Sequence, residues 1–424
     1  VMEQATFEIH QAEGALEALE DHLRAAGFFE PIAPAGVCAD VYLGYGLSEG
    51  LRRTEGTARP EPAALPLAAC RVRRTDEPAA EVGGYSAGAW ETTWAAADYV
   101  RAVALAREAI AAGEVYQVNL VQHLSATFEG DPGGLAAALA GFAPLHPRPL
   151  SGPGWSIVSA TPELFLARRG RRMWTMPIKG TRPAGHAASL QGSGKDAAEH
   201  VMIVDLERND LGRICVAGSV RWPELMQARS MTGVEHLVSL VEGVVREDVG
   251  FAEAMRAMFP GGSVTGAPKI AALDHINALE PVGRGASMGA LGTVWPNGDF
   301  ELALTIRTFA ISADRIHLWV GGGIVWDSDP AHEVEESWVK ARPLLEALAA
   351  AVDLSNGLAG QRQGMAVHPV IDAEHRLTDH RHDVQIMRYH QDTHFLPKMD
   401  QRLNELLLHG EIDVRRGLIE QQQF

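Results

Sequence analysis

Cysteine is scarce in this sequence, with three residues in 424, and their positions show no paired spacing. Cys38, Cys70 and Cys215 therefore predict neither a disulfide framework nor a thiolate metal site, as expected for a reduced, cytoplasmic protein. Long hydrophobic runs are also lacking, so we expect no membrane-spanning helix. The first residues are acidic and amphipathic, unlike a secretion signal.

Positive charge is scarce as well. The chain carries 37 lysines and arginines against 54 aspartates and glutamates, a formal net charge of −17. This balance argues against nucleic acid and against anionic membrane surfaces as partners. An anionic substrate would have to meet a local basic pocket, because the average surface repels it.

Hydrophobic residues make up 46% of the chain, which is ample for burial. The length of 424 residues is too great for one ordinary compact core, so we expect two domains or one large composite domain. Apolar residues recur at helical spacing in residues 16–23 and 99–110, and residues 52–82 are typical of a linker or a loosely held strand. The polar segment from Ser355 contains many histidines. The run from Asp379 to Asp383 could bind a metal adventitiously, but a solvated tail is the favoured interpretation.

One lysine stands in an unusual local context. Lys179 lies between Pro177 and Pro183 and directly before a glycine. The preceding residues, 172–176, predict a strand that enters a turn, so we expect the lysine to point into a cavity. A buried lysine that loses its proton is a nucleophile. A loop lysine that binds phosphate or carboxylate is the competing interpretation, and this run alone does not decide between them.

Two sets of carboxylates share helix faces. Asp196 and Glu199 are three residues apart at the start of a predicted helix, and Glu333, Glu336 and Lys340 recur at helical spacing in another. Two such faces could hold Mg²⁺ between them through oxygen ligands. Acids in a first helical turn and an ordinary Glu336–Lys340 surface pair explain the same pattern, and in isolation that is the favoured interpretation.

Further candidates for binding an anion follow from backbone patterns. Arg307 lies in a predicted alternating strand, Leu302 to Phe309, where an inward arginine needs an anion such as a carboxylate. Gly266-Ala267-Pro268 predicts a glycine turn that opens a helix with proline in its first turn, where exposed amides bind anions. Gly321-Gly322-Gly323 permits close approach to a ligand, although a tight bend would use the same residues.

Eight segments between about Trp90 and Leu345 form an ordered set of motifs. They are Gly113–Leu120, Thr161–Phe165, Met176–Pro183, Glu199–Asp210, His236–Ser239, Pro260–Lys269, Thr305–Thr308 and Gly321–Val325. Taken in this order, they resemble the chorismate-utilising enzymes. The resemblance implies an α+β fold of the anthranilate synthase component I type, with facing antiparallel sheets at the centre and helices outside. Periodicity alone predicts only a mixture of helices and strands.

The resemblance also divides the chain into three parts. Residues 1–89 would form a reduced N-terminal subdomain with a linker, and residues 90–353 the catalytic domain. Residues 354–424 match nothing in the family and would be a polar, histidine-rich tail. No segment matches the tryptophan-binding motif of the feedback-regulated members.

Roles for individual residues are implied by the same resemblance. Glu163 would be the general acid that protonates the departing hydroxyl of chorismate, which requires a buried carboxyl group, whereas a turn-capping carboxylate is the alternative. Glu199 and Glu336 would bind Mg²⁺ directly, with Asp196 and Glu333 water-mediated or supporting.

Two interpretations of His236 stay open. It would lie near the pyruvyl ether of the substrate as a catalytic residue, or it would be a core histidine satisfied by a backbone partner. The resemblance implies these substrate-binding residues: Gln117, Thr265, Gly266, Ala267, Arg307, Gly321, Gly322, Gly323 and Lys340.

The combination of Gln117 with Lys179 points to one branch of the family. Within the family that the chain resembles, isochorismate and salicylate synthases have lysine at the first position and alanine at the second. Anthranilate synthases have glutamine at the first position and alanine at the second. Aminodeoxychorismate synthases typically combine glutamine with lysine. The implied reaction has two steps, in which Lys179 attacks C2 of chorismate and ammonia then enters at C4 and expels the lysine.

Partners and alternatives follow from this assignment. Ammonia would come from a separate glutamine amidotransferase, and the product would serve 4-aminobenzoate and folate synthesis. The alternatives are an anthranilate synthase component I, another chorismate-utilising enzyme, or a non-catalytic binding homologue. The intact set of Lys179, Glu163, Glu199, Glu336 and Arg307 argues against the last of these.

Overall fold

The structure is a computed structural model that describes residues 5–54, 56–78, 82–183, 185–186, 190, 194–231 and 234–358. The histidine-rich run from residue 359 onward, including Asp379–Asp383, lies outside the described residues. Ser355 to Leu358, which the sequence assigned to the tail, belong to the last helix.

Ten described strands form one antiparallel sheet, in the order β1-β3-β2-β15-β16-β9-β10-β13-β11, with β12 also paired to β13. The strands are β1 (Phe7–Ile9), β2 (Val37–Leu43), β3 (Ala68–Arg74), β9 (Leu164–Arg169), β10 (Arg172–Met176), β11 (Ile178–Pro183), β12 (Arg221–Met231), β13 (Val234–Val244), β15 (Ala290–Val294) and β16 (Phe300–Leu304).

Eight further strands form a second antiparallel sheet in the described part of the chain, in the order β14-β6-β18-β17-β8-β7, with β4 and β5 also paired to β6. The strands are β4 (Tyr85–Ala87), β5 (Glu91–Thr92), β6 (Gln117–Gly130), β7 (Leu150–Gly152), β8 (Trp155–Ser159), β14 (Gly266–Ala267), β17 (Thr308–Ser312) and β18 (Arg315–Ile324).

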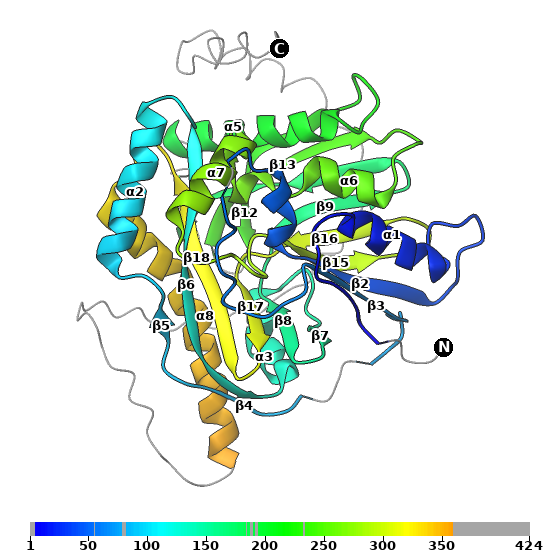
Figure 1. The fold of residues 1–424 in the computed structure, drawn as a ribbon, viewed down its shortest axis with the longest axis horizontal. Helices are drawn as coiled ribbons and strands as arrows, with labels where there is room; N and C mark the ends of the chain where they lie inside the picture. Colours follow the sequence, from blue (N-terminus) through cyan, green and yellow to red (C-terminus); the bar gives the residue numbers. More distant parts are fainter. Residues whose placement is uncertain are drawn as a thin grey trace. The chain divides into compact units, whose positions relative to one another are not determined.

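Helices lie on the outside of both sheets (Figure 1). They are α1 (Ala15–Ala25), α2 (Ala96–Ala111), α3 (Pro132–Leu139), α5 (Gly194–Gly212), α6 (Phe251–Met258), α7 (Lys269–Leu279) and α8 (Pro330–Leu358), with short 3-10 turns at Tyr45–Leu51, Ala140–Phe142 and Gly262–Val264. Helix α8 packs on β18 beside α2, α5 packs on β13, and α1 packs on α6. None of these helices is long and apolar enough to cross a membrane within the described residues.

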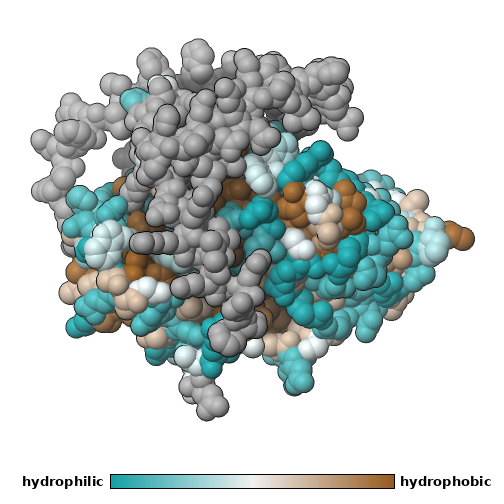
Figure 2. Space-filling model, turned by 90° about the horizontal axis from the view of Figure 1, so that it is seen from above, coloured by the Kyte–Doolittle hydropathy of each residue, from teal (hydrophilic) through white to brown (hydrophobic). Residues whose placement is uncertain are grey.

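The main hydrophobic core joins the two sheets. It contains Val41 and Leu291 from the ten-stranded sheet and Val118 and Ile157 from the eight-stranded sheet. Burial of apolar side chains from both sheets in one cluster holds them face to face. The predicted α+β arrangement of facing antiparallel sheets is therefore present. On the face seen in Figure 2, hydrophobic residues form separate patches among hydrophilic ones.

Local patterns predicted several elements correctly. Leu19 and Leu23 are fully buried on one face of α1, and α2 ends just before Gly113, whose φ of 77° suits glycine. Cys215 is buried, as expected for a core residue.

The segment 52–82 differs from its prediction. Residues 68–74 form β3, which is paired on both edges, with β1 and with β2. Cys70 on this strand is fully buried. A loosely held strand is therefore not what the structure contains here, because β3 is an interior strand of the larger sheet.

Candidate active site

The chain crosses between the two sheets at two neighbouring points. Residues 160–163 connect β8 to β9, and residues 305–307 connect β16 to β17. The backbone N–H of Leu304 donates to the carbonyl of Glu163 at 2.9 Å, and that of Ala160 donates to the carbonyl of Arg307 at 2.9 Å. Glu163 and Arg307 therefore lie side by side at the junction of the sheets.

The predicted continuous strand from Leu302 to Phe309 is wrong. β16 ends at Leu304, β17 begins at Thr308, and Arg307 between them has a φ of 49°. The left-handed backbone turns the chain from one sheet into the other, which an alternating strand could not do. Burial lowers the pKa of Arg307, and Glu163 opposes this shift.

Lys179 lies in β11 and not in the predicted turn. It pairs with Leu237 of β13, and the register shifts between Lys179 and Arg182, so the segment is a bulged strand. The predicted burial of the lysine is present, because its side chain is 12% exposed. Its Nζ lies 3.0 Å from Glu199 Oε1 and donates to the carbonyl of Ser263 at 3.2 Å.

Ser263 links the lysine to the predicted acid. Its hydroxyl donates to Glu163 Oε1 at 2.9 Å, and Glu163 is 6% exposed. Burial raises the pKa of Glu163, although the Lys179 charge and the Ser263 hydrogen bond oppose the shift. The carboxyl group thus meets the requirement for a general acid, a raised pKa at a buried position.

Glu199 is held by two donors from different elements. Besides Lys179, Gln117 Nε2 at the start of β6 donates to Glu199 Oε1 at 2.9 Å. Burial alone would raise the pKa of Glu199, but Lys179 and the Gln117 hydrogen bond outweigh burial and leave the pKa below its usual value. Glu199 is therefore a carboxylate at neutral pH.

The three glycines of β18 make room for these side chains. They pair with β6 as strand residues, so the alternative of a tight bend is wrong. A Cβ on Gly323 would lie 1.8 Å from Gln117 Nε2 and 3.2 Å from Glu199 Oε1. A Cβ on Gly321 would lie 1.9 Å from the carbonyl oxygen of Leu120.

Helix α8 approaches the same strand with its acidic face. A Cβ on Gly322 would lie 3.2 Å from Lys340 Nζ, 3.4 Å from Glu336 Oε1 and 3.5 Å from Glu333 Oε2. Lys340 Nζ pairs with Glu336 Oε1 at 2.8 Å and donates to the carbonyl of Gly321 at 2.8 Å. The predicted face of α8 is therefore confirmed.

The fit to a hard cation rests on these carboxylates. Oxygens of Glu336 and Glu333 lie 3.4 and 3.5 Å from the Cβ position of Gly322, and Glu199 Oε1 lies 3.2 Å from that of Gly323, whose Cβ points to the other face of the strand. Such donors suit Mg²⁺. Among the described residues, no three His, Cys, Asp or Glu side chains already form a metal-holding group. Asp196 belongs to α5, but its side chain lies outside the described part of the chain.

The predicted anion-binding turn has a different structure. Gly266 and Ala267 are buried in β14, paired with β6, and α7 begins at Lys269 with Pro268 as its N-cap. A Cβ on Gly266 would lie 2.1 Å from the Gln117 carbonyl, so close strand pairing requires glycine there. Thr265 Oγ1 donates to the carbonyl of Gly261 at 3.1 Å. These residues shape the turn that carries Ser263.

His236 lies on β13 beside the lysine strand. Its Nδ1 donates to the carbonyl of Gly180 at 3.0 Å. Burial lowers the pKa of His236, and this backbone hydrogen bond opposes the shift. The backbone partner of the second interpretation is present, one residue from Lys179.

The sequence assigned no role to two residues that connect the parts of the candidate site. Ser263 belongs to a recognised motif, but its contact with Glu163 spans 100 residues and has no local signature. Arg284 is 1% exposed and donates to the carbonyls of Val264 at 2.9 Å and Asn119 at 2.7 Å, which ties the turn to β6.

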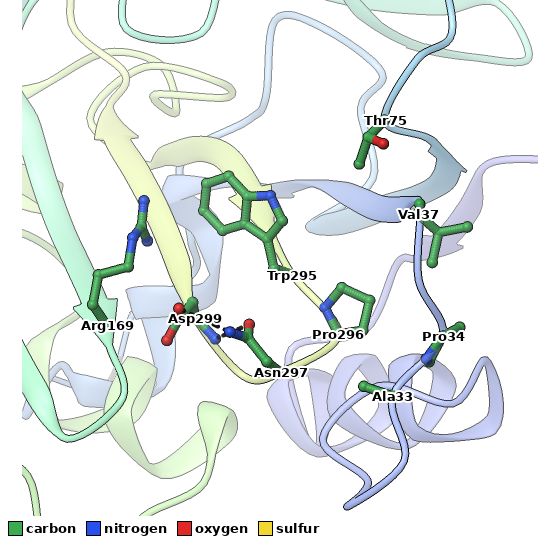
Figure 3. A pocket seen from close by; sticks show the side chains of 10 residues that line it. Ala33, Pro34, Val37, Thr75, Arg169, Trp295, Pro296, Asn297 and Asp299 are labelled. Carbon is green, nitrogen blue, oxygen red and sulfur yellow. Dashed lines mark hydrogen bonds between the residues drawn. The ribbon is translucent and has the colours of Figure 1, made fainter. Parts of the chain in front are cut away.

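A separate open hollow of about 440 Å³ contains none of the predicted site residues. In Figure 3 the Trp295 ring lies between Arg169 on one side and Thr75 and Val37 on the other. The Arg169 guanidinium carbon is 4.5 Å from the Trp295 ring centroid. The predicted site residues therefore lie at the sheet junction and not at this hollow.

The profile of the chorismate binding enzymes matches residues 47–346. Because this match covers more than half of the chain, the protein belongs to that family. The match begins well before Trp90, where the sequence motifs begin, and includes the strand β3.

Curated relatives divide between two activities. Anthranilate synthase component 1 of Thermus thermophilus is 39% identical over 291 residues, covering 65% of this chain and 62% of the relative. Aminodeoxychorismate synthase component 1 of Escherichia coli is 38% identical over 269 residues, covering 61% and 59%. The chain thus spans about three fifths of the length of these relatives.

Solved structures share the fold. Anthranilate synthase component I from Streptococcus pneumoniae has a TM-score of 0.69 and 26% identity, covering 76% of this chain and 84% of that one. The menaquinone-specific isochorismate synthase from Escherichia coli has a TM-score of 0.57 and 16% identity, covering 80% and 100%, and bears on the fold alone. The predicted fold class is confirmed.

Proposed function

We propose that the chain is component I of an aminodeoxychorismate synthase, which converts chorismate and ammonia to 4-amino-4-deoxychorismate. One observation carries the proposal. A buried lysine, Lys179, contacts Ser263, and the same serine holds the buried acid Glu163. A nucleophile and a general acid that contact the same residue suit a chemical substitution reaction, in which one bond forms as another breaks.

In the first step, Lys179 loses one proton to solvent, which ends its ion pair with Glu199, and the neutral amine attacks C2 of chorismate. The ring double bonds shift, the C4–O bond breaks, and Glu163 gives its proton to the departing hydroxyl, which leaves as water. The ionised Glu163 then takes a proton from the lysine nitrogen. In the second step ammonia attacks C4 and the double bonds shift back. Glu163 returns its proton to the lysine nitrogen as the C2–N bond breaks, and it then takes one proton from the new C4 ammonium group.

Binding of the substrate would use the charges around this centre. Arg307 suits a carboxylate through its planar guanidinium, and Lys340 adds positive charge beside the glycine strand. Glu199 and Glu336 would hold Mg²⁺, with Glu333 and Asp196 in support, and the bound ion would supply positive charge to the ring carboxylate.

Gln117 offers a binding position for ammonia. Its Oε1 is buried and has no hydrogen-bond partner among the described residues. A buried acceptor without a donor is costly, and an N–H of ammonia would satisfy it. The name component 1 in the relatives supports a second subunit, so ammonia would come from a glutamine amidotransferase, in the cytoplasm, for the synthesis of 4-aminobenzoate and folate.

The second candidate is component I of an anthranilate synthase. Relatives of that name are as similar as the aminodeoxychorismate synthases, at 39% and 38% identity. That reaction would place nitrogen directly at C2, with no need for a lysine nucleophile. The position of Lys179 in the site favours the first candidate.

The test is product identification. The purified chain is incubated with chorismate, Mg²⁺ and ammonium, and the product is identified by mass and by the position of its amino group. We expect 4-amino-4-deoxychorismate, and only traces with glutamine in place of ammonium. Anthranilate, or unchanged chorismate under all conditions, would contradict the proposal.

A further inference from the structure

A second buried glutamate lies two turns after Glu199 on α5. Glu207 is 3% exposed, and its Oε1 accepts a hydrogen bond from the backbone N–H of Gly262 at 3.0 Å. Its other oxygen, Oε2, is buried and has no hydrogen-bond partner among the described residues. None of the steps above uses this residue.

Gly262 touches α5 closely enough to fix the turn. A Cβ on Gly262 would lie 2.6 Å from Leu206 Cδ2 and 3.0 Å from Glu207 Oε1. The next residue is Ser263, which donates to Glu163 through its hydroxyl and accepts from Lys179 through its carbonyl. Anchoring of the Gly262 amide therefore sets the position of both contacts.

We propose that Glu207 is a positioning residue that acts on Glu163 and Lys179 through the Gly262–Ser263 turn. The inference rests on the proposed function for the roles of these two groups. Its geometric part, that Glu207 holds the turn, stands on the contacts alone.

Charges on three elements face Glu207. Burial raises the pKa of Glu207 to about 7, Lys269 on α7 opposes the shift, and Asp210 on α5 and Glu163 at the sheet junction add to it. Lys269 Nζ pairs with Asp210 Oδ2 at 2.5 Å, so its charge is shared. Because repulsion between carboxylates is mutual, an ionised Glu207 also keeps Glu163 protonated to higher pH.

Three variants separate anchoring from charge. Glu207→Gln keeps an acceptor for the Gly262 amide but removes the charge, and Glu207→Leu removes both. Asp205→Asn is the matched control, because Asp205 lies on the same helix with its side chain 44% exposed and paired to Arg208. The kcat for chorismate amination is measured against pH for each variant and for the parent chain.

We expect Glu207→Gln to keep kcat within about twofold at acidic pH, because the acceptor remains. The fall of its kcat at high pH should begin at a lower pH than in the parent chain, because Glu163 loses its proton more easily without the Glu207 charge. Glu207→Leu should lose about tenfold or more in kcat. Asp205→Asn should superimpose on the parent chain. An unshifted Glu207→Gln profile together with a fully active Glu207→Leu variant would overturn the inference.

A readout without activity keeps the two proposals distinguishable. Hydrogen exchange of the peptide spanning residues 260–266 reports on the Gly262 amide. We expect slow exchange in the parent chain and in Glu207→Gln, and faster exchange in Glu207→Leu. Equal exchange in all three would overturn the positioning role even if the chain does not turn over chorismate, and a failure to fold of Glu207→Leu leaves the Glu207→Gln pH profile as the deciding result.

Discussion

Two lysine–glutamate pairs in the candidate site have nearly the same geometry and very different surroundings. Lys179 lies 3.0 Å from Glu199, with side chains 12% and 18% exposed. Lys340 lies 2.8 Å from Glu336, with side chains 39% and 54% exposed. The distance between the charged atoms therefore does not distinguish the two pairs, whereas the burial of their side chains does.

The difference follows from the elements that carry each pair. Lys179 and Glu199 come from β11 and α5 and meet beneath the turn of Ser263. Lys340 and Glu336 are one turn apart on α8, as in an ordinary surface pair, which contributes at most about 1 kcal/mol. Buried charges interact far more strongly. Only the buried pair of Lys179 and Glu199, the inner pair, therefore suits control of a nucleophile, and the more exposed pair of Lys340 and Glu336 is the outer pair.

The largest effect is expected from a substitution that breaks the inner pair. Lys179→Ala removes the nucleophile, and we expect the rate of C4 amination to fall on the order of 10³-fold or more. Lys340→Ala is the matched control in the outer pair and should lose much less. Steady-state kinetics with chorismate and ammonium compare them, and equal losses would mean that burial does not separate the two lysines.

The next effect concerns the acid beside the inner pair. Glu163→Gln cannot give a proton, so we expect kcat to fall about 10²- to 10⁴-fold. Because burial raises the pKa of Glu163, the parent chain should stay active above the pH at which an ordinary glutamate ionises, and lose activity as pH rises further. The pH profile of kcat checks this, and activity that rises through that range would contradict the assignment.

A smaller effect is expected in the outer region. Glu336→Gln should weaken metal-dependent turnover by about 10²-fold without loss of the fold, because one of two proposed Mg²⁺ ligands is lost. Turnover is measured across Mg²⁺ concentrations and in excess chelator, with circular dichroism as the control for folding. Full activity of the parent chain in chelator would contradict the metal proposal.

The smallest effect lies outside both pairs. A chain that ends after Leu358 keeps every proposed site residue, so its ammonia-dependent kcat should stay within about twofold of the parent chain. Loss of activity with an unchanged circular dichroism spectrum would show that the removed segment contributes to the site.

Local periodicity predicted the parts of the site that lie within single elements. The carboxylate face of α8, the strand entry after Pro162 and the buried face of α1 all follow from spacing over a few residues. The eight ordered motifs added the family and its fold.

The remaining features depend on contacts between distant segments. The left-handed backbone of Arg307 arises where the chain leaves one sheet for the other, and no residue pattern between Leu302 and Phe309 marks that point. The hydrogen bond from Ser263 to Glu163 and the pairing of β3 likewise need the assembled sheets. Sequence spacing carries no information about such pairings.

The central claim is that Lys179 becomes covalently attached to the substrate. The parent chain is mixed with chorismate and Mg²⁺ without ammonia, quenched and digested, and the peptide containing residues 176–182 is weighed by mass spectrometry. We predict an increase equal to chorismate less one water in the parent chain. Lys179→Arg should show no increase and form no product, because guanidinium stays protonated. Normal C4 amination by Lys179→Arg, with no adduct on the parent chain, would contradict the account.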